Sequence, residues 1–489
     1  MNISDMRKQN PWWEDPGRIH EDLKLREFEN ASVKWMPRLL KYINLEKNAV
    51  YSLRGPRQVG KTTVVKILIR NLLAEKNASN IMYFACDSVK DNQELIGLLE
   101  EYNGWVKKQN SGRIFIFLDE ITAVKDWQKA IKFFIDSNSS VTMLITGSNV
   151  LDIKKSTERL PGRTGEKEGV SSNKILLPMK FAEYVEMRNP QLYEQVKKWG
   201  IHEPQARNEE FKQIISGNLP KSSWDLSRLL LQLDSLFDEY LITGGIMLAV
   251  NEYANTKKIS PQLYDLYLKQ VIGDITRSGR EEKTAKLILA SILKRMGTAA
   301  SWNGIRTEND IASSSTVEQY AYILRDTFVI SIFYLIELDG KQKPSSNKKI
   351  YVENPFIFHA LRNWLYEGTR DPFITTNEYL ENPQTKSVLV ESVVANHLCR
   401  IAYSFRPSDI FDPSDNVFYT KTKKGIEIDF ILRTPNGPRG VEVKYQNQIN
   451  IGDLIGIKKL KQGVLVSKSK FEQKDGIAVI PVSLFLLYI

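Results

Sequence analysis

Cysteine and histidine are scarce in this chain of 489 residues. It contains two cysteines, Cys86 and Cys399, and four histidines that are scattered along the sequence. Two cysteines are too few for a disulfide framework, and they do not make a zinc-binding pattern with the histidines. We therefore expect a protein of the reducing cytoplasm without structural zinc.

Long apolar runs are also missing. The first ten residues lack the apolar core of a signal peptide, and no stretch is apolar over the length that a bilayer requires. The apolar end of the chain, residues 477–489, is short and contains Pro481, which favours a buried strand over an anchor. The sequence predicts no attachment to a membrane.

Length and charge set the broad class. A chain of 489 residues with 42% hydrophobic composition is long enough for several domains, each with its own core. The net charge is +10 and the isoelectric point is about 9.1. This charge favours a polyanionic partner such as nucleic acid, although a basic enzyme without such a partner has the same composition.

A phosphate-binding motif stands near the start of the chain. Residues 51–63 contain the pattern G-x-x-x-x-G-K-T between an apolar stretch and a run with helical spacing, which is the strand, loop and helix that the motif requires. Its glycines let the loop bend so that backbone N–H groups surround a phosphate. The predicted nucleotide-binding residues are Gly55, Pro56, Arg57, Gln58, Val59, Gly60, Lys61, Thr62 and Thr63.

The same motif predicts ATP and Mg²⁺ as cofactors. Lys61 would reach the β- and γ-phosphates, and the Thr62 hydroxyl would hold Mg²⁺. Residues 113–120 form a continuous apolar run that ends in Asp119 and Glu120, as expected for a parallel strand buried on both faces. Asp119 would bind Mg²⁺ through water, and Glu120 would polarise the water that attacks the γ-phosphate. We predict ATP hydrolysis with Lys61 and Glu120 as catalytic residues.

A further strand is predicted over residues 141–147 and ends in small polar side chains. Thr146, Ser148 and Asn149 are candidates to hydrogen-bond the γ-phosphate or the attacking water, and Ser148 or Asn149 is favoured. Helix capping after the strand is the alternative role for these residues.

These motifs resemble a large prokaryotic family of AAA-type ATPases, related to the archaeal ATPases, that carry a nuclease-like C-terminal domain. The resemblance rests on the two ATP motifs, on Leu144-Ile-Thr-Gly-Ser, on Leu160-Pro-Gly-Arg163 and on Glu239-Tyr-Leu-Ile-Thr-Gly-Gly. It implies that Arg163, with Arg159 as the alternate, is an arginine finger at the γ-phosphate; a solvated arginine is the alternative. Arg163 could act within its own subunit or from a neighbouring one, and only the second case would imply a homo-oligomer.

We expect an α/β protein in which a P-loop AAA-type ATPase core is followed by a helical lid, a winged helix and a restriction-endonuclease-like α/β domain. The pair Trp12 and Trp13 in the N-terminal arm is expected to pack on the ATPase core or a neighbouring subunit, with surface binding as the alternative. The predicted boundaries are 1–48 for the N-terminal arm, 49–180 for the ATPase core, 181–280 for the lid, 281–340 for the winged helix and 350–489 for the last domain.

The winged helix is predicted from a serine-capped helix followed by two apolar strands. Its presumed recognition helix, residues 315–326, carries Gln319 and Arg325 but few other basic groups, so that DNA reading and a packing role are both open. Residues 341–349 are polar and rich in lysine, which indicates a linker.

Three segments of the last domain carry candidate catalytic groups. A predicted helix carries Glu391, one predicted strand carries Asp429, and the next carries Glu442 and Lys444, which share a face because they are two residues apart. An Asp followed by Glu-x-Lys is the pattern of restriction-endonuclease-like enzymes. Asp429 and Glu442 would hold Mg²⁺, Glu391 would add a further ligand or an outer-shell base, and Lys444 would orient or stabilise the attacking hydroxide. The alternative is a hairpin with a Glu–Lys pair on an exposed face.

The sequence thus supports two functional hypotheses. In the first, ATP hydrolysis drives a DNA-binding, Mg²⁺-dependent nuclease-like domain. In the second, the protein is a nucleotide-switched signalling or interaction module whose C-terminal domain binds a partner without cleaving it.

Overall fold

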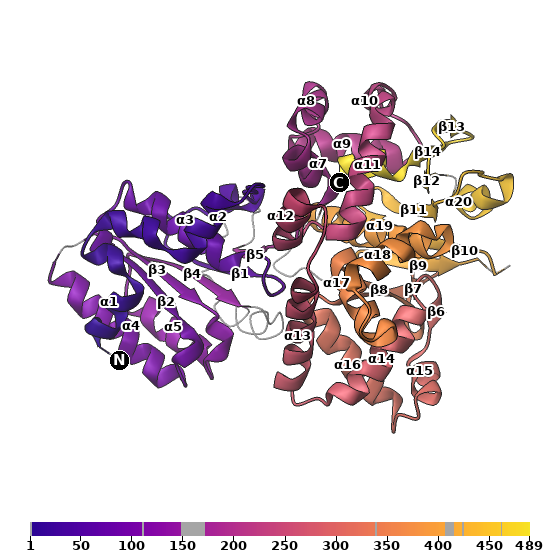
Figure 1. Ribbon diagram of the computed structural model, residues 1–489. Helices are drawn as coiled ribbons and strands as arrows, with labels where there is room; N and C mark the ends of the chain where they lie inside the picture. Colours follow the sequence, from indigo (N-terminus) through magenta and orange to yellow (C-terminus); the bar gives the residue numbers. More distant parts are fainter. Residues whose placement is uncertain are drawn as a thin grey trace. The chain divides into compact units, whose positions relative to one another are not determined.

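The computed structural model describes residues 2–109, 112–147, 172–337, 340–405, 415–422, 425–460 and 462–489. The chain divides into two compact units, one built mainly from residues 1–177 and the other mainly from residues 178–489 (Figure 1). No helix among these residues is long and apolar enough to cross a membrane.

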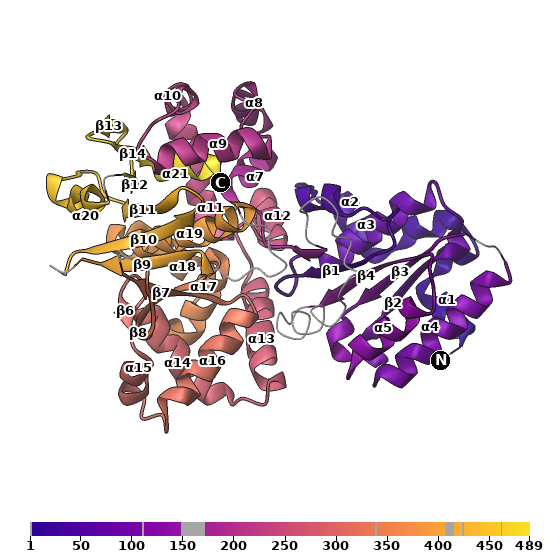
Figure 2. The same ribbon diagram turned by 180° about the vertical axis from the view of Figure 1, so that it is seen from behind.

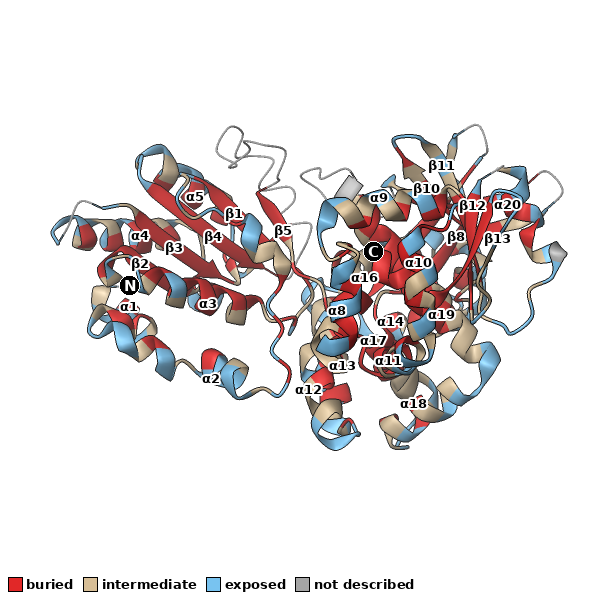
Figure 3. Cartoon of the chain, turned by 90° about the horizontal axis from the view of Figure 1, so that it is seen from above, coloured by how far each residue is buried: buried red, intermediate tan, exposed pale blue. Residues whose placement is uncertain are grey.

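The first unit is built on a parallel sheet with the strand order β2-β3-β4-β1-β5. Nearly every residue of these strands is buried, because helices cover both faces (Figure 3). The prediction of an α/β protein with a parallel core is confirmed. The strands are β1 (Val50–Arg54), β2 (Ile81–Ala85), β3 (Ile114–Asp119), β4 (Val141–Gly147) and β5 (Asn173–Ile175).

Helix α3 (Lys61–Leu73) covers one face of this sheet, whereas α4 (Asn92–Lys107) and α5 (Trp127–Asp136) cover the other (Figure 1). In α5 the buried residues are Trp127, Ala130, Ile131 and Phe134, at the i, i+3, i+4, i+7 spacing of a one-sided helix. Together with buried residues of α4 and the strands, they form one apolar cluster. This packing fixes the strand ends, where the motifs lie.

The N-terminal arm covers β2, the edge strand of the sheet. The arm contains α1 (Ile3–Gln9) and α2 (Leu23–Asn30), with a 3₁₀ helix over Pro11–Trp13 between them. Trp12 is 1% exposed, and the indole N–H groups of Trp12 and Trp13 both donate to the carbonyl of Ile81, at 2.9 and 2.8 Å. The prediction that the tryptophan pair packs on the core is confirmed. The arm supplies hydrogen bonds that an edge strand would otherwise make with solvent or another chain.

The second unit begins with a run of helices, in the region predicted as a lid. They are α7 (Phe181–Arg188), α8 (Pro190–Lys198), α9 (Pro204–Ile215), α10 (Lys221–Leu226), α11 (Leu230–Thr243), α12 (Met247–Thr256) and α13 (Pro261–Arg277). The turn after α11 uses Gly244 at φ 60°, and a Cβ there would lie 2.1 Å from the Asn354 side chain, which donates to the Gly244 carbonyl at 2.7 Å. The Gly-Gly turn is therefore held by contacts within this unit.

A mixed sheet forms the rest of the second unit, in the order β13-β14-β12-β11-β10-β9-β7-β8-β6 (Figure 2). The helix α19 (Pro383–Phe405) lies against β8, β9, β10 and β11. The strands are β6 (Ala299–Ala300), β7 (Ile330–Ile336), β8 (Gln342–Val352), β9 (Val417–Lys421), β10 (Glu427–Thr434), β11 (Gly437–Lys444), β12 (Gly463–Ser467), β13 (Glu472–Lys474) and β14 (Ile477–Pro481). The remaining helices include α17 (Pro355–Arg362), α18 (Pro372–Glu381), α20 (Ile455–Lys459) and α21 (Val482–Phe485).

One expectation was wrong: residues 341–349 are not a linker, because most of them belong to β8, which pairs with β7 at Gln342 and Lys343 and again from Lys348 to Val352. β7 in turn pairs with β9 at Leu335 and Tyr419, so the hairpin shares a sheet with the C-terminal strands. A polar, lysine-rich composition indicated solvent exposure. In the fold, strand pairing satisfies the backbone, and carboxylates far away in the sequence neutralise Lys349.

The elements predicted as a winged helix follow one another as expected: α14 (Glu282–Lys294), α15 (Trp302–Glu308), α16 (Ser314–Asp326) and the β7–β8 hairpin. On α16, Arg325 pairs with Asp326 at 2.9 Å, and Gln319 accepts a hydrogen bond from Arg280 at 2.6 Å. These contacts within the chain agree with a packing role for α16. The winged helix itself stays a prediction.

Two buried histidines connect helices of the second unit. His397 on α19 accepts a hydrogen bond from the Phe181 N–H at 3.1 Å, and His359 on α17 lies 3.1 Å from the Leu241 carbonyl. Both side chains are 2% exposed. Burial lowers the pKa of His359 to about 3 and places the pKa of His397 well below its usual value.

Each of these two histidines is expected to make a contribution to the stability of the second unit that is lost in acid. As pH falls below about 6.5, the unfolded chain binds a proton at each histidine that the folded chain does not, so the free energy of unfolding decreases by about 1.4 kcal/mol per pH unit for each. The free energy of unfolding, measured with urea at several pH values, should therefore change less positively from about pH 5 to about pH 7 in the His359→Gln/His397→Gln variant than in the wild type. The slope that is compared is this change per pH unit. The control is His20→Gln at an exposed position; an equal slope in all three proteins would contradict the prediction.

Candidate functional site

The phosphate loop joins the end of β1 to the start of α3. Helix α3 begins at Lys61, directly after Gly60, which adopts φ 102°. Gly55 is needed for a different reason: a Cβ there would lie 2.0 Å from the carbonyl oxygen of Leu176, which follows β5. The glycines of the motif therefore meet the requirement of a loop that bends closely around its ligand.

Lys61 and Thr62 occupy the first turn of α3. The Lys61 ammonium, on a residue that is 6% exposed, donates to the loop carbonyls of Gly55 and Pro56, at 3.0 Å each. The Thr62 hydroxyl donates to Asp119 Oδ2 at 2.7 Å. The fold thus brings together the two predicted Mg²⁺ ligands, which lie 57 residues apart in the sequence.

Asp119 lies at the carboxyl end of β3 and is 5% exposed. Its Oδ1 accepts a hydrogen bond from the Thr146 hydroxyl of the neighbouring strand β4, and its Oδ2 also accepts one from the Tyr83 hydroxyl, at 3.0 Å. Thr146 in turn accepts the backbone N–H of Glu120 at 3.0 Å. Three hydroxyl groups therefore orient the carboxylate, and the sequence had indicated two of them, Thr62 and Thr146.

Glu120 follows β3 in a left-handed conformation, with φ 50°. This conformation is unfavourable for a residue with a Cβ, and such strain is concentrated at functional sites. It turns the chain into the 3₁₀ helix Ile121–Ala123 immediately after β3. Glu120 directly follows Asp119 in the chain and is only partly buried. Contact with water is what its predicted role, the activation of water, would require.

The oxygen groups at this site fit Mg²⁺. Thr62 and Asp119 provide a hydroxyl and a carboxylate 2.7 Å apart at a loop suited to phosphates, and Mg²⁺ is bound by few protein oxygens together with substrate phosphates and water. The residues present are thus those that would hold Mg²⁺ together with ATP.

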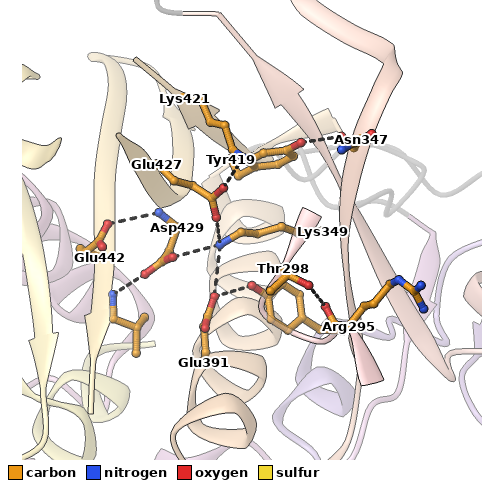
Figure 4. Close-up of polar contacts among 12 residues, drawn as sticks. Arg295, Thr298, Asn347, Lys349, Glu391, Tyr419, Lys421, Glu427, Asp429 and Glu442 are labelled. Carbon is orange, nitrogen blue, oxygen red and sulfur yellow. Dashed lines mark hydrogen bonds and ion pairs between the residues drawn. The ribbon is translucent and has the colours of Figure 1, made fainter. Parts of the chain in front are cut away.

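The second unit contains a separate cluster of charged side chains, shown in Figure 4. The Asp429 carboxylate accepts the Val443 N–H at 3.0 Å, and a carboxylate oxygen of Glu442 accepts the Asp429 N–H at 3.3 Å. Lys444 lies 2.6 Å from Glu442 and 3.9 Å from Asp429. The structure therefore places the predicted Asp and Glu-x-Lys side chains in contact across β10 and β11; their roles stay predictions.

Lys349 lies at the centre of this cluster and was not identified from the sequence. Its side chain is 1% exposed, and its ammonium lies 3.3 Å from Glu391, 2.7 Å from Glu427 and 2.9 Å from Asp429. Figure 4 shows the ammonium between these three carboxylates. Glu427 shares a face of β10 with Asp429, a signal that the sequence contained, but nothing local pointed to Lys349.

The charges of the cluster perturb one another. Burial raises the pKa of both Glu391 and Glu442 to about 7, and the nearby charge of Asp429 acts in the same direction. Burial alone would lower the pKa of Lys349, but Asp429, Glu391 and Glu427 outweigh it and raise that pKa above its usual value. Lys349 is therefore an ammonium held by carboxylates.

This arrangement does not fit a divalent cation as it stands. Within the described ranges, no group of three or more His, Cys, Asp or Glu side chains is placed to hold a metal ion. Lysine ammonium groups lie against Glu391, Asp429 and Glu442, the three residues predicted as metal ligands.

Family models match three parts of the chain. Residues 47–185, which contain the phosphate loop, Asp119 and Glu120, match a model described as an AAA domain. This part of the chain is an AAA-type P-loop ATPase domain. Residues 234–367 and 386–485 match two domains of unknown function, DUF8612 and DUF4143. The ATPase part of the resemblance is confirmed, whereas the restriction-endonuclease-like domain stays a prediction.

Individual proteins similar to this chain are distant from it in sequence. An uncharacterised protein of Methanocaldococcus jannaschii is 21% identical over 322 residues, which are 63% of this chain and 62% of the relative, so the chain spans less than two thirds of that protein. A Walker-type ATPase of Pyrococcus abyssi is 14% identical over 71% of this chain and 95% of its own, with a TM-score of 0.36. Cdc6p of Pyrobaculum aerophilum is 14% identical over 73% of this chain and 95% of its own, with a TM-score of 0.24. TM-scores of this size do not establish a common overall arrangement.

Some residues predicted for the ATP site lie outside the described ranges. These are the sensor candidates Ser148 and Asn149 and the arginine-finger candidates Arg163 and Arg159. Thr146, the third sensor candidate, is described and contacts Asp119 and Glu120 as given above.

Proposed function

We propose that this protein binds ATP with Mg²⁺ at its phosphate loop, hydrolyses it, and uses the nucleotide state to control its C-terminal domain. The observation that carries the proposal is the contact between Thr62 and Asp119, with Glu120 next in the chain. This contact supports the proposal because the groups proposed for phosphate binding, metal binding and water activation then lie at one end of the parallel sheet.

The residues have separate roles in this reaction. Lys61 exchanges its loop carbonyl partners for the β- and γ-phosphates, and it neutralises charge that develops during transfer. Thr62 and Asp119 hold Mg²⁺, which supplies electrostatic stabilisation of the phosphate oxygens when it is bound. Glu120 accepts a hydrogen bond from the attacking water and orients it toward the γ-phosphate.

For the C-terminal domain, the geometry best supports binding of a partner without cleavage. The supporting observation is Lys349, whose ammonium already forms ion pairs with Glu391, Glu427 and Asp429. A cluster whose carboxylates are satisfied from within the chain has structural value without a metal.

The second candidate is a DNA-binding, Mg²⁺-dependent nuclease-like domain. It is favoured by the contacts among Asp429, Glu442 and Lys444, which lie on adjacent strands in the order that the nuclease pattern requires. Nucleic acid as a partner also agrees with the net charge of +10.

One set of assays tests both parts of the proposal. ATP hydrolysis is expected in the wild type and not in Lys61→Ala; equal rates would refute the ATPase proposal. Linear, circular and branched DNA incubated with Mg²⁺ or Mn²⁺, with and without ATP, is expected to remain intact. Cleavage by the wild type that is lost in Asp429→Ala would instead establish the nuclease candidate.

A further inference from the structure

Tyr83 connects the predicted Mg²⁺ ligand Asp119 to the N-terminal arm. It lies on β2, is 7% exposed, and its hydroxyl donates to Asp119 Oδ2 at 3.0 Å. The Thr62 hydroxyl donates to the same oxygen. Tyr83 is therefore the one of these two donors that is not itself a predicted metal ligand.

The ring of Tyr83 is held from its face by a buried lysine. The Lys66 ammonium lies 3.4 Å from the ring centroid and 5.3 Å from the centroid of the Trp12 ring. Lys66 is 6% exposed and pairs with Asp22 at 3.1 Å. A cation over an aromatic face is an attractive contact that strengthens as water is excluded, so Lys66 restrains the orientation of the ring.

The N-terminal arm also fixes the backbone of this strand. The Asn10 side chain accepts the Tyr83 N–H at 2.6 Å and donates to the Tyr83 carbonyl at 2.8 Å. Asp22 and Trp12 belong to the same arm. The arm thus positions the backbone of Tyr83 directly and acts on its ring through Lys66, which pairs with Asp22 of the arm.

We propose that Tyr83 is a positioning residue of the ATPase, which fixes the Asp119 carboxylate for Mg²⁺ and makes the N-terminal arm part of the metal-binding machinery. Thr62 must present its oxygen to Mg²⁺, whereas the Tyr83 hydroxyl is available to hold Asp119 throughout the cycle. The inference rests on the proposed hydrolysis of ATP.

Tyr83→Phe tests this role, because it keeps the ring and its contact with Lys66 and removes only the hydroxyl. A hydrogen bond to a charged group contributes a factor of about ten or more in an equilibrium, and only part of it should be lost here because the Thr146 hydroxyl still holds Asp119. We therefore expect the Mg²⁺ concentration for half-maximal ATP hydrolysis to rise about 3- to 10-fold. The dissociation constant of Mn²⁺ from the enzyme–nucleotide complex, measured by electron paramagnetic resonance, should rise by the same factor. ATP affinity measured in EDTA should change less than about twofold.

The matched control is Tyr102→Phe. Tyr102 is also a buried tyrosine of the first unit, and its hydroxyl donates to the Ser79 carbonyl at 3.0 Å. This variant should lose a buried hydrogen bond without changing the Mg²⁺ or Mn²⁺ dependence. Equal metal dependence in Tyr83→Phe and Tyr102→Phe would overturn the proposal and leave Tyr83 a structural residue.

Asp22→Asn tests the connection to the arm. Asp22 caps α2 by accepting the Lys24 N–H, and asparagine caps helices equally well, so the substitution removes mainly the charge that holds Lys66. A rise of about twofold in the same metal constants is expected, and no rise would overturn the role of the arm. If the wild type shows no hydrolysis that depends on Lys61, the proposed function fails, whereas unchanged metal constants in an active Tyr83→Phe refute this inference alone.

Discussion

Replacing Glu120 with glutamine is expected to lower kcat for ATP hydrolysis by about 10²- to 10⁴-fold while ATP still binds. Glutamine has nearly the same size but cannot take a proton from water, so the attacking water is no longer activated. The phosphate loop and Lys61 are unchanged, and nucleotide affinity should therefore remain within about threefold of the wild type. Steady-state hydrolysis and equilibrium binding of a fluorescent ATP analogue measure the two quantities separately.

The structure indicates that the Glu120→Gln substitution leaves the backbone at this position unchanged. Glu120 is held by its own backbone, through the N–H bond to Thr146 at 3.0 Å and a φ of 50°, so the glutamine variant should keep the same position. The control is Glu101→Gln on the exposed face of α4, which should leave kcat unchanged. A kcat for Glu120→Gln within about threefold of the wild type would show that another group activates the water.

The ATP site could be predicted because the residues that form it belong to short, continuous segments of the sequence. Gly55 to Thr62 form one continuous loop, and Asp119 and Glu120 end one continuous apolar strand. Parallel strands bring their carboxyl ends to the same edge of the sheet, so the contact between Thr62 and Asp119 follows from the fold class.

Contacts supplied by distant parts of the chain could not be predicted in this way. No pattern in the sequence around Tyr83 points to Asp119, although a buried tyrosine hydroxyl usually has a hydrogen-bond partner. Its partners Asn10 and Lys66 have no sequence relation to it. The arm was expected to brace the core, but its connection to Asp119 depends on which strand lies at the sheet edge, and edge order is a property of the whole fold.

In the cluster of charged side chains in the second unit, too, contacts from distant parts of the chain could not be predicted from the sequence. Asp429, Glu442 and Lys444 lie close in sequence and on neighbouring strands, so their proximity followed from strand periodicity. Lys349 lies 80 residues before Asp429, in a segment whose composition indicated a linker. It also lies outside the 386–485 region matched by the C-terminal family model. Only the pairing of β8 with β7, and of β7 with β9, brings Lys349 to the carboxylates.

Replacing Lys349 with methionine is expected to reduce the free energy of unfolding by about 3 kcal/mol at neutral pH. Methionine fills a similar volume but leaves Glu391, Glu427 and Asp429 without their shared ammonium in a site where the lysine side chain is 1% exposed. The estimate is at the lower end for a buried ion pair because the Glu427 side chain is 27% exposed and regains contact with water. Urea unfolding monitored by circular dichroism measures the change.

Lys421→Met is the matched control, because Lys421 also pairs with Glu427, at 3.1 Å, but its side chain is 46% exposed. Exposed ion pairs contribute little, so a loss below about 1 kcal/mol is expected. A much larger loss for Lys349→Met than for Lys421→Met means that the cluster depends on an internal cation, which supports a C-terminal domain that binds without cleaving. Equal losses would mean that water or a mobile cation already compensates the carboxylates, which is the condition that Mg²⁺-dependent cleavage at Asp429 and Glu442 would require.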